Sequence, residues 1–454
     1  MVESLTLSLK NALPPLDAVG VVYIAYSGGL DSQVLLHLAL ELRREVPIEL
    51  QALHLNHGLS DHAQAWQSRC AAQCAQYAIP LRCHEVMLDR SAGNIEQRAR
   101  EARYSWFEEL LKPGDVLLTA HHRDDQAETM VLRLLRGSGV RGLSGIPRER
   151  ELGRGRIVRP LLDHDKAELQ DYAEHHGLTW IEDESNYSIA FDRNYIRHQV
   201  LPALVQRWPQ AVRQLALSSR NCSEDQGLLD ALADMDIERM SGGEAPLLLE
   251  RAPPLQLSGF RGLSKARQRN VLNRVLRPML SYPVPLEQMN EWLRQIGQAT
   301  PESRPRLLLT QVMLAVHDGR IHFTCPPDPR WSAYSRKWRT DTPLSVLNGA
   351  FSLRLVERRL AAHGDVEGLG FQPGDEVCVC SRRGGERVQL PGEAFSRSLK
   401  KLYQEKRIAP WLRDNMPLIT LEGHLVWSAL LGDCAPFLLD SEGKCYGFEL
   451  YRNE

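Results

Sequence analysis

The chain has 454 residues, of which 43% are hydrophobic and 25% charged, and its formal net charge is −2. A chain of this length and composition is expected to form two or three globular domains. The longest apolar runs have only the length of a strand, which excludes a membrane-spanning helix, and the N-terminus lacks the apolar core of a signal peptide. The nine cysteines include no C-x₂-C pair, which indicates reduced thiols, a cytoplasmic protein and no zinc or iron–sulfur site.

From residue 1 to about 180, segments of strand pattern alternate with segments of helix pattern. Strands are predicted at 19–26, 48–56, 80–88, 115–120 and 156–162, and helices at 31–44, 64–77, 95–111, 124–135 and 166–176. This alternation predicts an α/β fold with a doubly wound parallel sheet covered by helices on both faces. Ligands of such sheets bind beyond the carboxyl ends of the strands, so functional residues should follow strands directly.

The first predicted strand is followed by Ser27-Gly28-Gly29-Leu30-Asp31-Ser32. The two glycines allow a sharp turn and a close approach of a ligand to the main chain. The start of the next helix offers unpaired N–H groups and partial positive charge, which suit a phosphate, and Asp31 is a candidate Mg²⁺ ligand. A turn capped by Asp or Ser is the structural alternative, but the six residues in this context favour a phosphate-binding loop.

Polar clusters also follow the second and fourth predicted strands, at 54–59 and at 121–129. Asp125 and Glu128 are three residues apart on a predicted helix and therefore share a face. The two carboxylates could hold Mg²⁺ or orient an amine, although capping of the helix start would explain one aspartate equally well. His121 and His122 have no further ligand at metal-binding spacing, so no transition-metal site is expected.

Beyond residue 215 the pattern changes to a polar helix, then a small mixed domain, and after about 345 to a β-rich segment. We predict domains at 1–215, 216–330 and 345–454, with helices at about 211–232 and 263–280 and a short basic helix at 399–407. Residues 251–277 carry seven basic residues and no acidic residue, and 381–413 carry nine basic against three acidic. Such blocks in a near-neutral chain suit contact with a polyanion.

The loop SGGLDS resembles the pyrophosphate-binding loop of the PP-loop ATPases, and it lacks the lysine of a Walker A motif. Further segments match one family of this superfamily in order: LNHGLS at 55–60, NIEQRAREARY at 94–104, HHRDDQAET at 121–129, GSGVRGLSGI at 137–146, RPLL at 159–162, WIEDESN at 180–186, DRNYIR at 192–197 and SLKKLYQEKRIAPWLRDNMPL at 398–418. By these segments the chain resembles the tRNA(Ile)-lysidine synthetases over nearly its whole length.

The resemblance implies a two-step reaction that uses ATP and Mg²⁺. ATP adenylates O2 of the wobble cytidine in the isoleucine tRNA with a CAU anticodon, and the ε-amine of free lysine then attacks C2 and displaces AMP. The product, lysidine, pairs with adenine, so the tRNA reads AUA instead of AUG. The resemblance also leaves room for a homodimer.

The resemblance implies the following site residues. ATP contacts are expected from Ser27, Gly28, Gly29, Leu30, Asp31, Ser32 and His57, with Asp31 on Mg²⁺. The residues expected to act in catalysis are Asp31, Asp125, Glu128 and Arg197, with Arg197 on the α-phosphate. Candidates for contact with lysine or cytidine are Arg100, Arg103, His121, Asp183, Asn186 and Asn194; Arg100 and Arg103 could instead pair with Glu96. Candidates for tRNA contact are Arg141, Lys265, Arg267, Arg269, Arg397, Lys400, Lys401, Lys406 and Arg407.

Three other functions remain open at this stage. A tRNA-thiolating enzyme of the same superfamily would be expected to carry a cysteine pair at the site. A synthetase that transfers nitrogen to a small molecule would need an ammonia source, and the first strand begins too early for a domain ahead of it. A non-catalytic RNA-binding protein would have no need to keep Asp31, Asp125 and Glu128.

Overall fold

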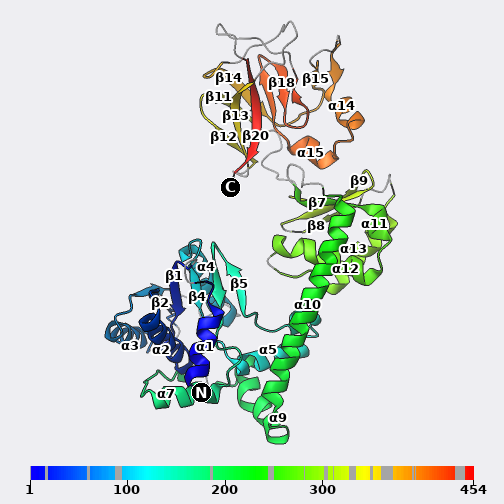
Figure 1. The fold of residues 1–454 in the computed structure, drawn as a ribbon. Coiled ribbons are helices and arrows are strands. Elements are labelled where there is room, and N and C mark those ends of the chain that lie inside the picture. The colour runs from blue at the N-terminus through cyan, green and yellow to red at the C-terminus, as the bar shows by residue number, and fades with distance from the viewer. Residues whose placement is uncertain are drawn as a thin grey trace. The chain divides into compact units, whose positions relative to one another are not determined.

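The computed structural model forms two compact units, Met1–Leu229 and Asp230–Glu454 (Figure 1). It describes residues 2–15, 19–58, 62–86, 95–184, 188–243, 250–280, 282–300, 305–309, 311–326, 334–347, 351–358, 372–390, 393, 395–434 and 445–453. No helix in these ranges is long and apolar enough to cross a lipid bilayer.

The first unit contains a six-stranded sheet with the order β3-β2-β1-β4-β6-β5. Its strands are β1 (Val21–Ala25), β2 (Glu49–Asn56), β3 (Leu81–Glu85), β4 (Val116–Leu118), β5 (Glu149–Leu152) and β6 (Gly155–Val158). The five predicted strands are present and run parallel to one another. β5 was not predicted; it pairs antiparallel with β6, and its arginine-rich segment has only Leu152 buried, so no alternating pattern marks it.

Helices cover both faces of this sheet, as predicted. In chain order the helices up to residue 241 are α1 (Val2–Ala12), α2 (Leu30–Glu45), α3 (Ala63–Gln76), α4 (Ile95–Leu110), α5 (Arg123–Leu135), α6 (Val140–Leu143), α7 (Lys166–His175), α8 (Asp192–Tyr195), η3 (Ile196–Val200), α9 (Leu201–Arg207) and α10 (Ala211–Ser241), and those that pack on the sheet are α1, α2, α3, α4 and α7. Val22 and Ile24 of β1 pack with residues of α1, α2, α3 and α7, whereas Tyr23 packs with Phe107 of α4. Successive side chains of a strand point to opposite faces, so β1 is buried on both sides and its end is held firmly.

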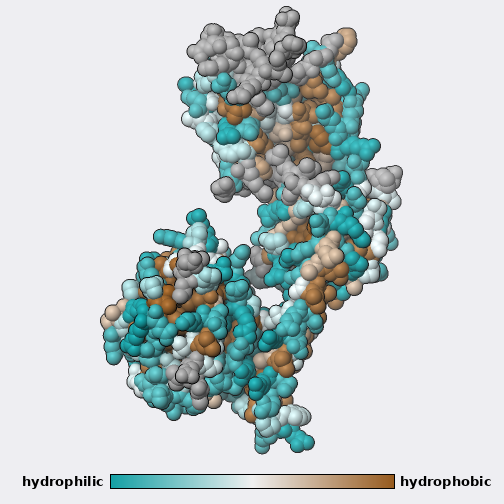
Figure 2. Space-filling view, viewed as in Figure 1, coloured by the Kyte–Doolittle hydropathy of each residue, from teal (hydrophilic) through white to brown (hydrophobic). Residues whose placement is uncertain are grey.

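The second unit begins within α10, a single helix that runs from the first unit into the second. It confirms the helix predicted at about 211–232 and extends it. Leu228 and Met235 are exposed on α10, and brown atoms lie along the helix in Figure 2. The domain bounds 1–215, 216–330 and 345–454 stay predictions.

The remainder of the second unit has a mixed part and a β-rich part, as the sequence predicts. The mixed part has a sheet of order β7-β10-β9-β8 and a core shared with α11, α12 and α13. Its elements are β7 (Glu250–Gln256), α11 (Leu257–Arg261), α12 (Lys265–Leu276), η4 (Arg277–Met279), α13 (Leu286–Gln298), β8 (Arg306–Leu308), β9 (Met313–His317) and β10 (Arg320–Thr324).

The β-rich part contains sheets of order β11-β14-β17-β18-β19, β12-β13-β20 and β15-β16. Its elements are β11 (Ser335–Arg339), β12 (Leu344–Val346), β13 (Phe351–Arg358), β14 (Glu376–Cys380), β15 (Arg387–Val388), β16 (Arg397–Ser398), α14 (Leu399–Glu405), α15 (Pro410–Asn415), β17 (Leu418–Leu421), β18 (His424–Ser428), β19 (Gly432–Asp433) and β20 (Cys445–Arg452). The predicted short basic helix is α14. Trp411 of α15 is buried and lies edge-on to His317 and His322 of the mixed part.

The start of β1 is held by the buried carboxylate of Asp115, which lies just before β4. Its Oδ1 accepts from the N–H of Val21 at 2.9 Å, and its Oδ2 accepts from the N–H of Lys112 at 2.9 Å. Such hydrogen bonds stabilise a buried carboxylate, and without it the two N–H groups would lose their acceptor. This contact fixes the strand that carries the glycine loop.

We predict that Asp115→Ala lowers the free energy of local opening at β1 by about 3 kcal/mol, because two charge-assisted hydrogen bonds are lost. Hydrogen exchange of peptides that cover β1 measures this change. The control variant Asp163→Ala removes an exposed carboxylate paired with Arg148. It should change the free energy of local opening at β1 by less than about 1 kcal/mol. Equal exchange in the two variants would contradict the prediction.

Candidate active site

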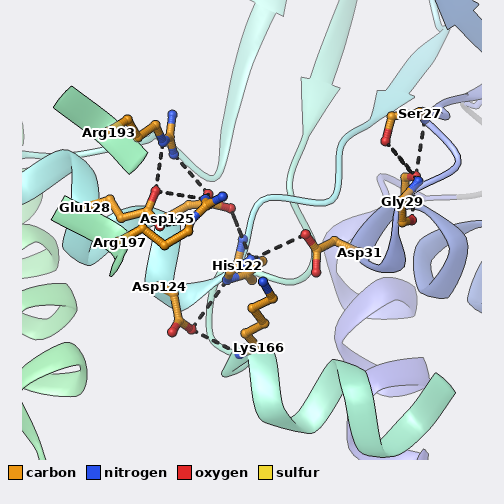
Figure 3. A network of polar contacts seen from close by, with 11 residues as sticks. Ser27, Gly29, Asp31, His122, Asp124, Asp125, Glu128, Lys166, Arg193 and Arg197 are labelled. Atoms are coloured by element: carbon orange, nitrogen blue, oxygen red, sulfur yellow. Dashed lines mark hydrogen bonds and ion pairs between the residues drawn. The ribbon is translucent and has the colours of Figure 1, made fainter. Parts of the chain in front are cut away.

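The glycine loop joins the end of β1 to the start of α2, and its two serine hydroxyls hold it in shape (Figure 3). Ser27 Oγ lies 3.0 Å from Ser32 Oγ, and the N–H of Ser27 donates to Ser32 Oγ at 3.2 Å. Ser32 Oγ donates in turn to the carbonyl of Gly29, which is the N-cap of α2. Glycine has no side chain to cap a helix, so the N-terminus of α2 is suited to an anionic ligand.

Gly28 has φ +84°, in the region that favours glycine. A Cβ atom at this position would lie 2.7 Å from Cδ1 of Ile181 and 2.8 Å from Sγ of Cys70. The carbonyl of Gly28 also accepts from the N–H of Ile181 at 2.9 Å. The segment around Ile181 therefore lies against the loop, and it brings the half-buried candidate Asp183 to the same region.

Asp31, in the first turn of α2, is linked to the start of α5 through the buried side chain of His122. His122 Nε2 lies 3.6 Å from Asp31 Oδ2 and 3.6 Å from Asp125 Oδ2, and its Nδ1 lies 3.4 Å from Asp124 Oδ2. Burial disfavours the imidazolium, but the carboxylates outweigh burial and raise the pKa of His122 to about 10. His122 is thus a cation that joins three carboxylates.

Asp125 and Glu128 form ion pairs with two arginines of the segment α8–η3 (Figure 3). Arg193 donates from Nε to Glu128 Oε2 at 2.8 Å and from Nη2 to Asp125 Oδ1 at 2.9 Å. Arg197 donates from Nε to Glu128 Oε1 at 2.5 Å and from Nη2 to Glu128 Oε2 at 3.0 Å. Burial would raise the pKa of Asp125, but His122 and Arg193 hold it well below its usual range.

His57 and Arg103, two candidates from different segments, lie together. Arg103 Nη2 donates to His57 Nε2 at 2.9 Å. Burial, followed by the charge of Arg103, lowers the pKa of His57 to about 4, so the ring is neutral near pH 7. Burial likewise lowers the pKa of His121 to about 3, although Asp125 opposes this shift. Neither ring carries charge, so both act near pH 7 as neutral hydrogen-bonding groups.

Two other candidates make structural contacts. Arg100 stacks on the ring of Tyr104 at 5.0 Å, and Asn194 Nδ2 donates to the carbonyl of Ser188 at 2.9 Å. Asn186 lies outside the described residues.

The chain offers a fitting contact for Mg²⁺ at Asp31. Its Oδ1 atom is buried and has no hydrogen-bond partner among the described residues. In the described ranges no three His, Cys, Asp or Glu residues form a group that could hold a metal by themselves. Mg²⁺ commonly binds through one or two carboxylates together with substrate phosphates and water, so a single free carboxylate oxygen beside a phosphate loop suits it.

Comparison with protein families matches residues 2–204 to the PP-loop domain, 255–322 to the TilS substrate binding domain and 377–449 to the TilS substrate C-terminal domain. The tRNA(Ile)-lysidine synthase of Pseudomonas fluorescens (strain Pf0-1) is 41% identical over 399 residues, which are 87% of this chain and 86% of the relative. That of Coxiella burnetii (strain RSA 493 / Nine Mile phase I) is 35% identical over 94% of this chain and 92% of the relative.

The chain belongs to the tRNA(Ile)-lysidine synthase family. Among solved structures, the U34-tRNA thiolase NcsA from Methanococcus maripaludis with its [4Fe-4S] cluster covers 49% of this chain and 78% of its own, at 17% identity and a TM-score of 0.42. That likeness is too low to bear on function.

Within this lysidine synthase fold, the basic candidates for tRNA contact differ in their surroundings. Lys265, Lys400, Lys401 and Lys406 are exposed, and Arg141 is half-buried in α6. Four arginines have partners: Arg267 with buried Asp236, Arg269 with Asn290, Arg397 with Glu393 and Glu405, and Arg407 with Asp318. Arg267 fastens α12 to α10 through two hydrogen bonds, which is a packing contact.

Sequence reasoning missed two members of the charged network, His122 and Arg193. His122 lies in the predicted cluster but was considered only as a metal ligand. Arg193 precedes Arg197 by four residues, the spacing that puts two helical side chains on one face. This spacing was the available signal for Arg193, whereas nothing local marks His122 as a bridge to Asp31.

We predict that Gly28→Ala abolishes ATP binding, because the added Cβ collides with Ile181 and Cys70 and distorts the loop. Gly177→Ala is a matched control: its φ is +60° and a Cβ there meets nothing within 4 Å. Both variants should lose about 1–2 kcal/mol of stability from backbone strain, but only Gly28→Ala should lose ATP in equilibrium binding. Undiminished ATP affinity of Gly28→Ala would refute this account of the loop.

Proposed function

We propose that this chain joins lysine to C2 of the wobble cytidine in the isoleucine tRNA with a CAU anticodon, at the expense of ATP. The observation that carries the proposal is the continuous charged network from the glycine loop through Asp31 and His122 to the acidic pair Asp125 and Glu128. A phosphate-binding loop and a site for an ammonium group within one network suit a reaction that first uses ATP and then an amine.

In the first step, O2 of the cytidine attacks the α-phosphate and pyrophosphate leaves. The loop from Ser27 to Ser32 and the N-terminus of α2 would bind the pyrophosphate, and Arg197 would stabilise charge at the α-phosphate. Asp31 would hold Mg²⁺, which when bound supplies positive charge to the phosphates. Adenylation makes C2 electrophilic because the phosphoryl oxygen can leave with its electron pair.

In the second step, the ε-ammonium of lysine first loses one proton to water, the amine attacks C2, and AMP leaves with the O2 oxygen while the nitrogen releases a second proton and keeps one N–H. Asp125 and Glu128 would hold the ammonium before it is deprotonated. His57, Arg103, His121 and Asp183 lie on the same sheet edge or against the loop and are proposed contacts for the nucleoside or for the carboxylate of lysine. Asn194 would act indirectly, because its hydrogen bond to the carbonyl of Ser188 holds the segment before α8 in place.

The tRNA itself would be held outside the reaction centre by the second unit. Exposed lysines of α12 and α14 are suited to phosphate contacts that position an RNA without reading its sequence. We place the activity in the cytoplasm, where tRNA is modified. A homodimer stays a prediction that light scattering would test.

We predict that pure protein with ATP, Mg²⁺ and labelled lysine transfers the label to isoleucine tRNA with cytidine at the wobble position. A tRNA with uridine at that position should take up no label, because the amine needs an adenylated cytidine. Asp31→Ala should form no AMP yet bind tRNA, since its change lies in the ATP site. Transfer of sulfur from a thiol donor, instead of lysine, would favour a thiolating enzyme. Release of AMP by the Asp31→Ala variant would contradict the proposal that Asp31 holds Mg²⁺.

We also predict that Lys400→Ala combined with Lys401→Ala weakens tRNA binding and lowers the slope of log affinity against log salt by roughly 1–2, because each phosphate contact releases about one counterion. The matched control combines Lys10→Ala with Lys112→Ala, which removes the same charge from the first unit. ATP affinity should be unchanged in both variants. Equal salt slopes in the two double variants would exclude α14 from the RNA contact.

A further inference from the structure

Every oxygen of the two carboxylates proposed to bind the ammonium of lysine already accepts at least one hydrogen bond from the chain. Glu128 Oε1 accepts from Arg197, and Glu128 Oε2 accepts from both Arg193 and Arg197. Asp125 Oδ1 accepts from both arginines, and Asp125 Oδ2 accepts from the N–H of His122 at 3.0 Å. The acidic pair is therefore closed by groups of the chain itself.

The charges of this cluster also nearly balance. The carboxylates of Asp31, Asp124, Asp125 and Glu128 face the imidazolium of His122 and two guanidinium groups, four negative charges against three positive, so a further cation gains little attraction there. The Glu128 side chain is only 1% exposed, so an ammonium that entered would lose its water and meet only carboxylate oxygens already bonded to the chain. Lysine can bind to this pair only after one arginine has moved away.

We propose that Arg197 occupies the acidic pair in the absence of nucleotide and leaves it for the phosphates of ATP, so that ATP must bind before lysine. This inference rests on the proposed function and adds an order of binding to it. Departure of Arg197 removes the only partner of Glu128 Oε1 among the described residues and makes the net charge of the cluster more negative by one unit. Both changes favour an ammonium.

The position of Arg197 supports its choice over Arg193. Arg197 lies in η3, a π-helical turn, and such turns are common at functional sites. Figure 3 shows Arg197 on the side of the carboxylates toward His122 and Asp31, with Arg193 on the other side. A guanidinium binds phosphate with two parallel hydrogen bonds, as it binds a carboxylate, so the exchange of partners is chemically matched. Arg193 then stays to hold the two carboxylates together.

The test is the affinity for lysine, measured by calorimetry without tRNA, in the presence and absence of α,β-methylene-ATP with Mg²⁺. For the wild-type chain we expect lysine to bind at least about tenfold more tightly when the analogue is present. Lysine must then tighten the analogue by the same factor, because coupling between two binding sites is reciprocal. Equal affinity for lysine in the two conditions would overturn the inference.

Three variants separate the roles of the arginines. Arg197→Ala should bind lysine without nucleotide, and the analogue should then change its affinity by less than about twofold. Arg193→Ala should also bind lysine more tightly than the wild type without nucleotide, but should keep the coupling because Arg197 can still move. Arg136→Ala is the matched control, because it breaks an ion pair with Asp192 between α5 and α8 at 3.5 Å; it should behave as the wild type. Full coupling in Arg197→Ala would overturn the inference.

If Arg197→Ala does not fold, Arg197→Gln keeps the length of the side chain and a donor but removes the charge, and the same result is expected. Failure of this inference differs from failure of the proposed function. Lysine that enters tRNA but binds equally with and without the analogue leaves the function standing and refutes the order of binding. Absence of lysine binding with the analogue, together with absence of label in tRNA, refutes both.

Discussion

The burial of Asp125 and Glu128 is the constraint on which the first unit depends. Two carboxylates taken out of water are stable only if cations and donors replace the water. Arg193 and Arg197 from the segment α8–η3 and His122 from the residue before α5 supply them. To satisfy these charges, the segment α8–η3 has to lie against α5, and α5 has to begin beside Asp31 of α2. The charged network therefore holds α2, α5 and α8–η3 together and also supplies the functional groups of the site.

This arrangement gives the same side chains two functions. In the absence of ligand both arginines stabilise the carboxylates, and in the proposed reaction Arg197 contacts phosphate while the carboxylates contact an amine. Removing one partner of a buried ion pair commonly costs about 3–5 kcal/mol, so substitutions here will change stability and activity together. Binding measurements on folded variants are thus more informative about this site than loss of activity alone.

The sequence predicted the parts of the molecule that depend on local pattern. Alternating strands and helices gave the parallel sheet, and the rule that ligands bind beyond strand ends placed the loop at Ser27 and the pair Asp125 and Glu128 at one edge. The tertiary contacts were not predictable in this way. β5 has one buried residue and no alternation, the role of His122 depends on Asp31 from a distant segment, and Arg267 gains its packing contact only where α12 meets α10. Such roles follow from partners that lie far away in sequence.

Gly28 and Cys70 are in close contact beneath the phosphate loop, and this contact makes the thiol a natural reporter. Cys70 is fully buried, and burial raises its pKa to about 12, so the unreactive thiol form prevails. An alkylating reagent can modify Cys70 only when the core around it opens, and the glycine loop lies against it there, whereas Cys83 is exposed. The rate at which Cys70 is modified therefore reports how often the core next to the phosphate loop opens, and a ligand that holds the loop should lower it.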